Sequence, residues 1–147
     1  MAFQLDPAFE QTIIQALADS VNPNNEARRA AEEQLKQAQH SVGYASALLK
    51  ISGDQSLKGK FNIDLNHAAS IQFGQLVEIH WKFKDVEHAN NVSGGIDYII
   101  LDQNDKECVR NNLMHAIYEQ VLNKPIVKQY IRSLKQICIY DFPEKYT

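Results

Sequence analysis

Charged and polar side chains recur at three- and four-residue intervals in three segments of the sequence. In a helix this spacing places side chains on one face, about one turn apart. A face of this kind either binds another protein through ion pairs and hydrogen bonds or is simply solvated. The first strip is Arg29, Glu33, Lys36 and His40, the second strip is His67, Ser70, Gly74 and Glu78, and the third strip is Lys128, Arg132 and Lys135.

Residues that support catalysis or metal binding occur without the spacing that such chemistry needs. The five histidines show no metal-ligand pattern, and none is followed by glutamate as in HEAT-like di-iron hydroxylases. Cys108 and Cys138 form no CxxC pair, which predicts two small buried apolar side chains in a reducing compartment. The sequence has no GxxxxGK[ST], GxGxxG or GxSxG motif. We therefore expect no catalytic residues, no cofactor and no metal site.

The composition is that of one ordinary globular domain. Of 147 residues, 44% are hydrophobic and 22% are charged, which excludes wholesale disorder. No apolar run approaches the roughly eighteen residues of a membrane span, and the N-terminus lacks a signal-peptide pattern. The net charge is −3, whereas nucleic-acid-binding domains are usually basic. We expect neither direct nucleic-acid binding nor membrane insertion.

Helical periodicity and capping residues predict six helices. Asp6 and Pro7 are a typical helix start, and Phe9, Ile13 and Leu17 then recur on one face. Residues 83–95 are predicted to be a loop. For residues 96–101 we weigh a short strand against an extended, packed segment and favour the latter, because a lone strand has no partner. The other five helices are predicted at residues 26–40, 42–51, 64–82, 105–121 and 125–140.

The six helices form three successive pairs with a period of about 40–47 residues, as in HEAT repeats. The predicted fold is all-α: an α-solenoid of about three HEAT-type helix pairs in a right-handed superhelical stack. Because a solenoid needs a polar cap at its end, we expect residues 1–147 to be the N-terminal piece of a longer protein, with an apolar patch exposed beyond Tyr146. The predicted units are repeat one at 6–40, repeat two at 42–83, a loop at 84–104 and repeat three at 105–142.

Four stretches carry recognisable patterns in a fixed order. Residues 28–35 (RRAAEEQL) are similar to R-x-A-A-E-x-x-L, and residues 65–76 with Trp81 are similar to R-x-A-A-I-x-L-K-N followed by a tryptophan. Residues 41–49 resemble the start of a second repeat, and residues 105–110 with 141–146 resemble a third repeat closed by D-[FYW]-P-x-x-W. Together they resemble the N-terminal region of the importin-β (karyopherin) superfamily, closest to the importin seven/eight branch.

The departures from the family pattern are local. Gly74 and Gln75 replace the Lys-Asn pair, Asn66 replaces the arginine, and Tyr146 replaces the closing tryptophan. A glycine inside a helix costs about 1 kcal/mol relative to alanine. Gly74 therefore indicates either a close backbone contact or a diverged lineage. Trp81 is predicted to be a packing residue that closes the second repeat.

The resemblance implies a nuclear transport receptor that shuttles between cytoplasm and nucleus. In this family the N-terminal repeats bind the small GTPase Ran in its GTP form on the surface of the second helices, and this binding drives cargo release. The three strips are then candidate Ran contacts, and cargo and phenylalanine-glycine nucleoporins would bind downstream repeats. Two alternatives stay open: an exportin-type receptor of the same superfamily, and a HEAT-repeat scaffold without a GTPase partner.

Overall fold

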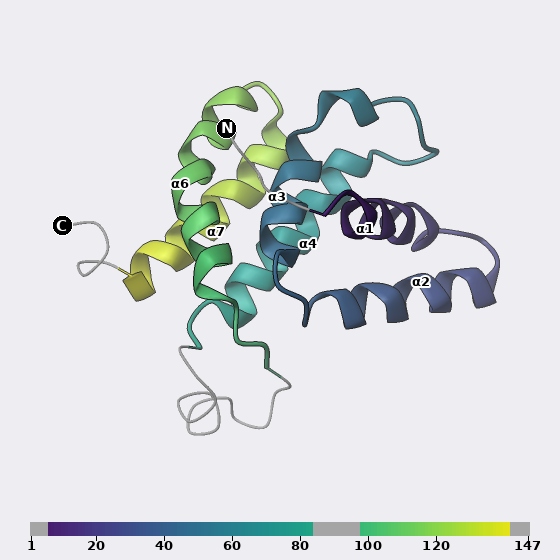
Figure 1. Ribbon diagram of the computed structural model, residues 1–147. Coiled ribbons are helices and arrows are strands. Elements are labelled where there is room, and N and C mark those ends of the chain that lie inside the picture. The colour runs from purple at the N-terminus through teal and green to yellow at the C-terminus, as the bar shows by residue number, and fades with distance from the viewer. Residues whose placement is uncertain (1–5, 84–97, 142–147) are drawn as a thin grey trace.

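The computed structural model describes residues 6–83 and 98–141, and within these ranges all regular structure is helical (Figure 1). This confirms the all-α prediction, and both ends of the five helices predicted with ranges lie within two residues of their predicted positions. The short η1 turn was not predicted. The elements are α1 (Pro7–Asp19), α2 (Asn25–Ala38), α3 (Tyr44–Gly53), η1 (Gln55–Leu57), α4 (Leu65–His80), α6 (Gln103–Glu119) and α7 (Lys124–Asp141).

Four helices begin at a local capping residue whose side chain accepts hydrogen bonds from free backbone N–H groups. Asp6 accepts from Ala8, and Asn24 accepts from Glu26 and Ala27. Asp64 and Asp102 do the same for α4 and α6. The Asp102 cap explains why α6 begins at Gln103, two residues earlier than predicted.

Helix α3 begins differently, because its cap comes from another repeat. Gly43 precedes it with φ of 94°, a left-handed conformation that glycine adopts without a steric cost, and offers no side chain as a cap. Instead the buried carboxylate of Asp105 accepts from the backbone N–H groups of Ala45 at 3.1 Å and Ser46 at 2.9 Å. The Ser46 hydroxyl donates to the same carboxylate. Asp105 thus joins the start of α3 to the start of α6.

Helix α4 lies at the centre of the molecule and packs against α3, α7 and α1. This confirms the prediction that the helix most apolar around its circumference has several neighbours. Helix α3 also packs against α6, and α1 packs against α2 (Figure 1). The largest buried side chains include Trp81, Tyr130, Phe73, Ile13 and Leu48.

Two buried side chains connect α7 to the preceding helices. Trp81, which follows α4, contacts the last residue of α7, and Tyr130 in the middle of α7 contacts α3. Trp81 is 1% exposed, and its ring N–H donates to Asp141 at 3.2 Å. Two cations lie close to the Trp81 ring: the Lys106 ammonium is 5.1 Å from the ring centre, and the Arg110 guanidinium is 5.7 Å from it. The predicted packing role of Trp81 is confirmed. The Tyr130 hydroxyl shares a hydrogen bond with Ser52 of α3. Burial raises the pKa of Tyr130 to about 12, even though this bond lowers it.

Asn66, which replaces the family's arginine, has a structural function here. Its amide is buried and donates to the carbonyl oxygens of Ile51 at 2.8 Å and Asp54 at 2.9 Å. These two carbonyls lie near the end of α3, where helical carbonyls lack partners within the helix. Asn66 therefore closes the end of α3 from the first turn of α4.

Residues 98–101 form no strand, and Ile99 and Leu101 are buried against the core. The predicted extended, packed segment is confirmed for these residues. The Ile99 N–H donates to Nδ1 of His80 at 3.1 Å. Burial, followed by the charges of His40 and Lys82, lowers the pKa of His80. Positions 84–97 of the predicted loop and strand segments, and positions 142–146 of the closing motif, lie outside the described residues.

The prediction that both cysteines are buried is wrong. Cys138 is exposed and Cys108 is only half-buried. Cys138 lies on the side of α7 that no other described helix covers, so its helical position does not bury it.

Within residues 6–83 and 98–141, no helix has the length and apolar character needed to cross a membrane.

Candidate partner-binding surface

The first strip is fully accessible. Arg29, Glu33 and Lys36 are exposed on α2, and His40 is exposed in the turn that follows. The buried residues of α2 are Ala31, Leu35 and Ala38, a narrow face of small side chains against α1. The whole outer circumference of α2 is therefore available to a partner.

The second strip is only partly accessible, which corrects the prediction of one exposed face. Ser70 is 0% exposed and donates to the His67 carbonyl at 2.7 Å, and Gly74 is also buried. His67 is half-buried, and Glu78 is exposed. The reason is that α7 packs along this side of α4, which a helical wheel of α4 alone does not show.

Gly74 faces α7 at the position of Gln129 and Arg132. A Cβ atom at this position would lie 2.7 Å from Oε1 of Gln129, inside any normal contact distance. The absence of a side chain lets Gln129 lie directly against α4. The predicted close contact at Gly74 is therefore present, but its partner is the end of the Gln129 side chain and not a backbone.

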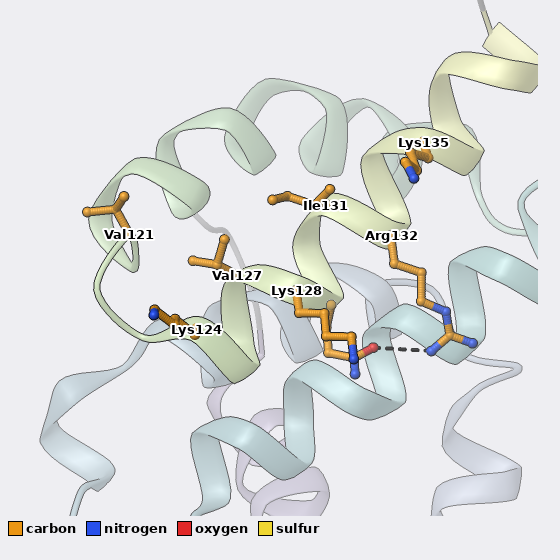
Figure 2. Close-up of a pocket in the computed structure, with 8 residues that line it drawn as sticks. Val121, Lys124, Val127, Lys128, Ile131, Arg132 and Lys135 are labelled. Atoms are coloured by element: carbon orange, nitrogen blue, oxygen red, sulfur yellow. Dashed lines mark hydrogen bonds between the residues drawn. The ribbon is translucent and has the colours of Figure 1, made fainter.

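The third strip is basic and lies beside this contact. Lys128 and Lys135 are exposed, and Arg132 is half-buried. Arg132 forms an ion pair with Glu78 of α4 and donates to Oε1 of Gln129 at 3.2 Å, the dashed line in Figure 2. Among the residues that the structure describes, Lys128 and Lys135 form no ion pair.

A hollow of about 730 Å³ runs along α7 and extends the third strip. Figure 2 shows Val127 and Ile131 pointing to one side of α7, and Lys128 and Arg132 pointing to the other. No carboxylate lines it, although the chain carries a net negative charge. Its lining residues are Val121, Lys124, Val127, Lys128, Gln129, Ile131, Arg132 and Lys135.

The structure brings two of the three strips together. Glu78 of the second strip and Arg132 of the third are in direct contact across α4 and α7. The rest of the first strip lies apart from this face, because α2 packs mainly on α1 (Figure 1), while His40 at its end is close enough to α4 for its charge to lower the pKa of His80. The candidate surface is therefore a continuous α4–α7 face and a separate α2 face.

Sequence reasoning missed two members of the α4–α7 face. Lys124 precedes Lys128 by four residues and continues the basic strip, so helical spacing alone was a sufficient signal. Gln129 gave no such signal, since its role depends on Gly74, 55 positions earlier.

The comparisons with known proteins agree with this architecture. The family model of the importin-beta N-terminal domain matches residues 31–119, from the middle of α2 to the end of α6. An importin beta-like SAD2 homolog from Arabidopsis thaliana is 32% identical over 130 residues, which cover 88% of this chain and 11% of that protein. Importin-8 from Danio rerio is 27% identical over 135 residues, which cover 92% of this chain and 12% of that protein.

The chain belongs to the importin-beta N-terminal domain family. Its described helices are those of a HEAT-type α-solenoid, and its similarity to Importin-8 confirms the expected position near the importin seven/eight branch. The chain spans about a tenth of the length of the two relatives.

Proposed function

We propose that this chain is the N-terminal region of an importin-like nuclear transport receptor that binds Ran in its GTP form and couples this binding to cargo release during nuclear import. The observation that carries the proposal is the family match over residues 31–119. This family consists of nuclear transport receptors, and binding of GTP-loaded Ran by the N-terminal repeats is the family's property.

The α4–α7 face supports a contact with an acidic protein surface. Lys124, Lys128 and Lys135 give it exposed positive charge, and Val127 and Ile131 place apolar surface beside these cations. Complementary charge raises the rate and the specificity of protein association. The α2 face, with both signs of charge, would add a second contact area on the same partner.

The wider proposal concerns the longer protein. Residues 1–147 would form the first three repeats of a right-handed solenoid, and downstream repeats would bind protein cargo and phenylalanine-glycine nucleoporins while the receptor shuttles between cytoplasm and nucleus. The lengths of the two relatives support this, as do exposed apolar side chains around the α6–α7 turn, where a further repeat would pack. They are Met114, Tyr118 and Leu122.

The test measures binding of the chain to Ran loaded with a non-hydrolysable GTP analogue and to Ran loaded with GDP, at low and at physiological salt. We expect binding to the GTP form only. The double variant Lys128→Gln/Lys135→Gln should weaken it about five- to tenfold, because two exposed charge contacts are lost.

The matched control is Lys58→Gln/Lys60→Gln, which removes two exposed charges from the η1–α4 segment and should leave the affinity unchanged. No retention of GTP-loaded Ran at low salt would overturn the proposal in favour of a scaffold. In the full-length receptor, a rise of cargo affinity on addition of GTP-loaded Ran would indicate an exportin instead.

A further inference from the structure

Arg132 is the one cation of the third strip that already has a carboxylate partner. It pairs with Glu78 across the gap between α4 and α7, and both side chains remain 40% exposed. Lys128, four residues earlier, and Lys135, three residues later, form no ion pair with the residues described. The partner of Arg132 comes from repeat two, so this ion pair also joins two repeats.

The neighbourhood holds Arg132 in this position. The Gln129 side chain lies opposite Gly74, and its Oε1 accepts a hydrogen bond from Arg132 at 3.2 Å. The guanidinium is planar, and its Nη2 pairs with Glu78 while Nη1 donates to Gln129. Gln129 and Glu78 thus each bind one terminal nitrogen of the Arg132 guanidinium.

Among the described residues, Glu78 is the carboxylate that pairs with the third strip, while Glu119 of α6 lines a neighbouring hollow with Val121 and Lys124. Helices α4 and α7 contain two carboxylates, Glu78 and Asp141, and Asp141 is paired with Arg110 at 2.9 Å. An exposed ion pair contributes little to stability and is screened by salt. A carboxylate on a partner's surface can therefore replace Glu78 on Arg132 with little loss to the fold.

We propose that Glu78 is an internal competitor for an acidic partner: in the free protein it occupies Arg132, and the partner's carboxylate displaces it on binding. This rests on the proposed function, since the partner is GTP-loaded Ran. Displacement removes the one ion pair that joins α4 to α7 among the described residues. The buried packing of α4 on α7, which includes the Phe73 and Tyr130 rings, stays in place during this exchange.

The test compares the affinity for GTP-loaded Ran of the wild type, Glu78→Gln, Arg132→Gln and the double variant. Glu78→Gln should bind about fivefold more tightly, because Arg132 no longer has a competing carboxylate. The double variant should bind no more tightly than Arg132→Gln, because the gain requires Arg132. Glu107→Gln, which removes one exposed carboxylate that pairs with an arginine of α6 away from both faces, controls for the change in net charge and should bind as the wild type does.

The outcomes separate the two proposals. If the wild type binds GTP-loaded Ran and Glu78→Gln binds equally or more weakly, the competitor is refuted and the proposed function stands. A gain that persists in the Arg132→Gln background also refutes it, since the effect is then general electrostatics. If no variant binds, the proposed function fails and the competitor fails with it. Thermal unfolding of each variant verifies that the fold is retained.

Discussion

Helices α2 and α4 are the second helices of neighbouring pairs and have similar lengths, yet their surroundings differ. Helix α2 buries three of its 14 residues, against α1. Helix α4 buries nine of its 16 residues, among α1, α3 and α7. Equivalent positions in a repeat therefore do not imply equivalent exposure.

The difference affects both stability and binding. Helix α2 offers a partner nearly its whole circumference but is held by a single contact face, so it should open at a lower free energy than the rest. Helix α4 offers mainly Glu78 and its neighbours at the edge shared with α7, while its other residues form the core.

Truncation of the Phe73 side chain should have the largest effect on the free energy of unfolding. The ring is 0% exposed on α4 and meets the Tyr130 ring edge-on at 6.3 Å between centroids. Phe73→Ala should lower the free energy of unfolding by about 3–5 kcal/mol, because burial is lost and a cavity remains. Urea unfolding measures it, and a loss under about 1.5 kcal/mol would mean that α4 is not the centre of the core.

The buried cap of α3 should matter more than the exposed cap of α2. Asp105→Ala leaves the backbone N–H groups of Ala45 and Ser46 buried without their acceptor, which we expect to cost about 3 kcal/mol. Asn24→Ala removes a solvent-accessible cap and should cost about 1 kcal/mol. Urea unfolding measures both variants. Equal losses of unfolding free energy would contradict the expectation that the buried cap of α3 contributes more than the exposed cap of α2.

Leu35→Ala should have an intermediate effect that is confined to the first pair. Leu35 is 8% exposed in the contact of α2 with α1. The expected loss is about 2 kcal/mol, the lower end for such truncations, because an edge site relaxes and admits water. Hydrogen exchange should become faster in α2 and stay unchanged in α4; acceleration in both helices would show that they unfold as one unit.

The smallest expected effect on the free energy of unfolding is the one that protonation of His80, at the end of α4, produces. Its pKa is lowered in the folded state, so the unfolded chain binds a proton more readily. The contribution of His80 to stability is fully present above its ordinary pKa of about 6.5 and is lost as pH falls toward the folded pKa. The slope cannot exceed about 1.4 kcal/mol per pH unit for one proton.

His80→Gln, whose side-chain oxygen can also accept from the Ile99 N–H, should reduce this slope. Urea unfolding between pH 5 and pH 7.5 measures both proteins. Parallel stability curves would show that His80 does not contribute to the pH dependence.

The helices could be predicted from the sequence because their signals are local. Asp6, Asn24 and Asp64 cap the helices that follow them directly, and the apolar spacing identifies each inward face. Helix α3 begins two residues later than predicted, since its cap is Asp105, about 60 positions away.

The candidate surface could be predicted only in part, because local patterns do not show which distant helix packs against a given face. Helical spacing identified the exposed strip on α2 and the basic strip on α7. It misplaced Ser70 and Gly74, because burial on α4 depends on the packing of α7, and it missed Gln129. The direction in which a helix faces its neighbour is a property of the pair and is not contained in one helix.

The Asp105 cap also sets an order for assembly on the ribosome. A nascent chain that has emerged as far as residue 100 contains all of repeat two, but it lacks the carboxylate that accepts from Ala45 and Ser46. The first turn of α3 therefore has to wait for α6 to be translated. The start of α3 is completed by α6, so repeats two and three mature together and not one after the other.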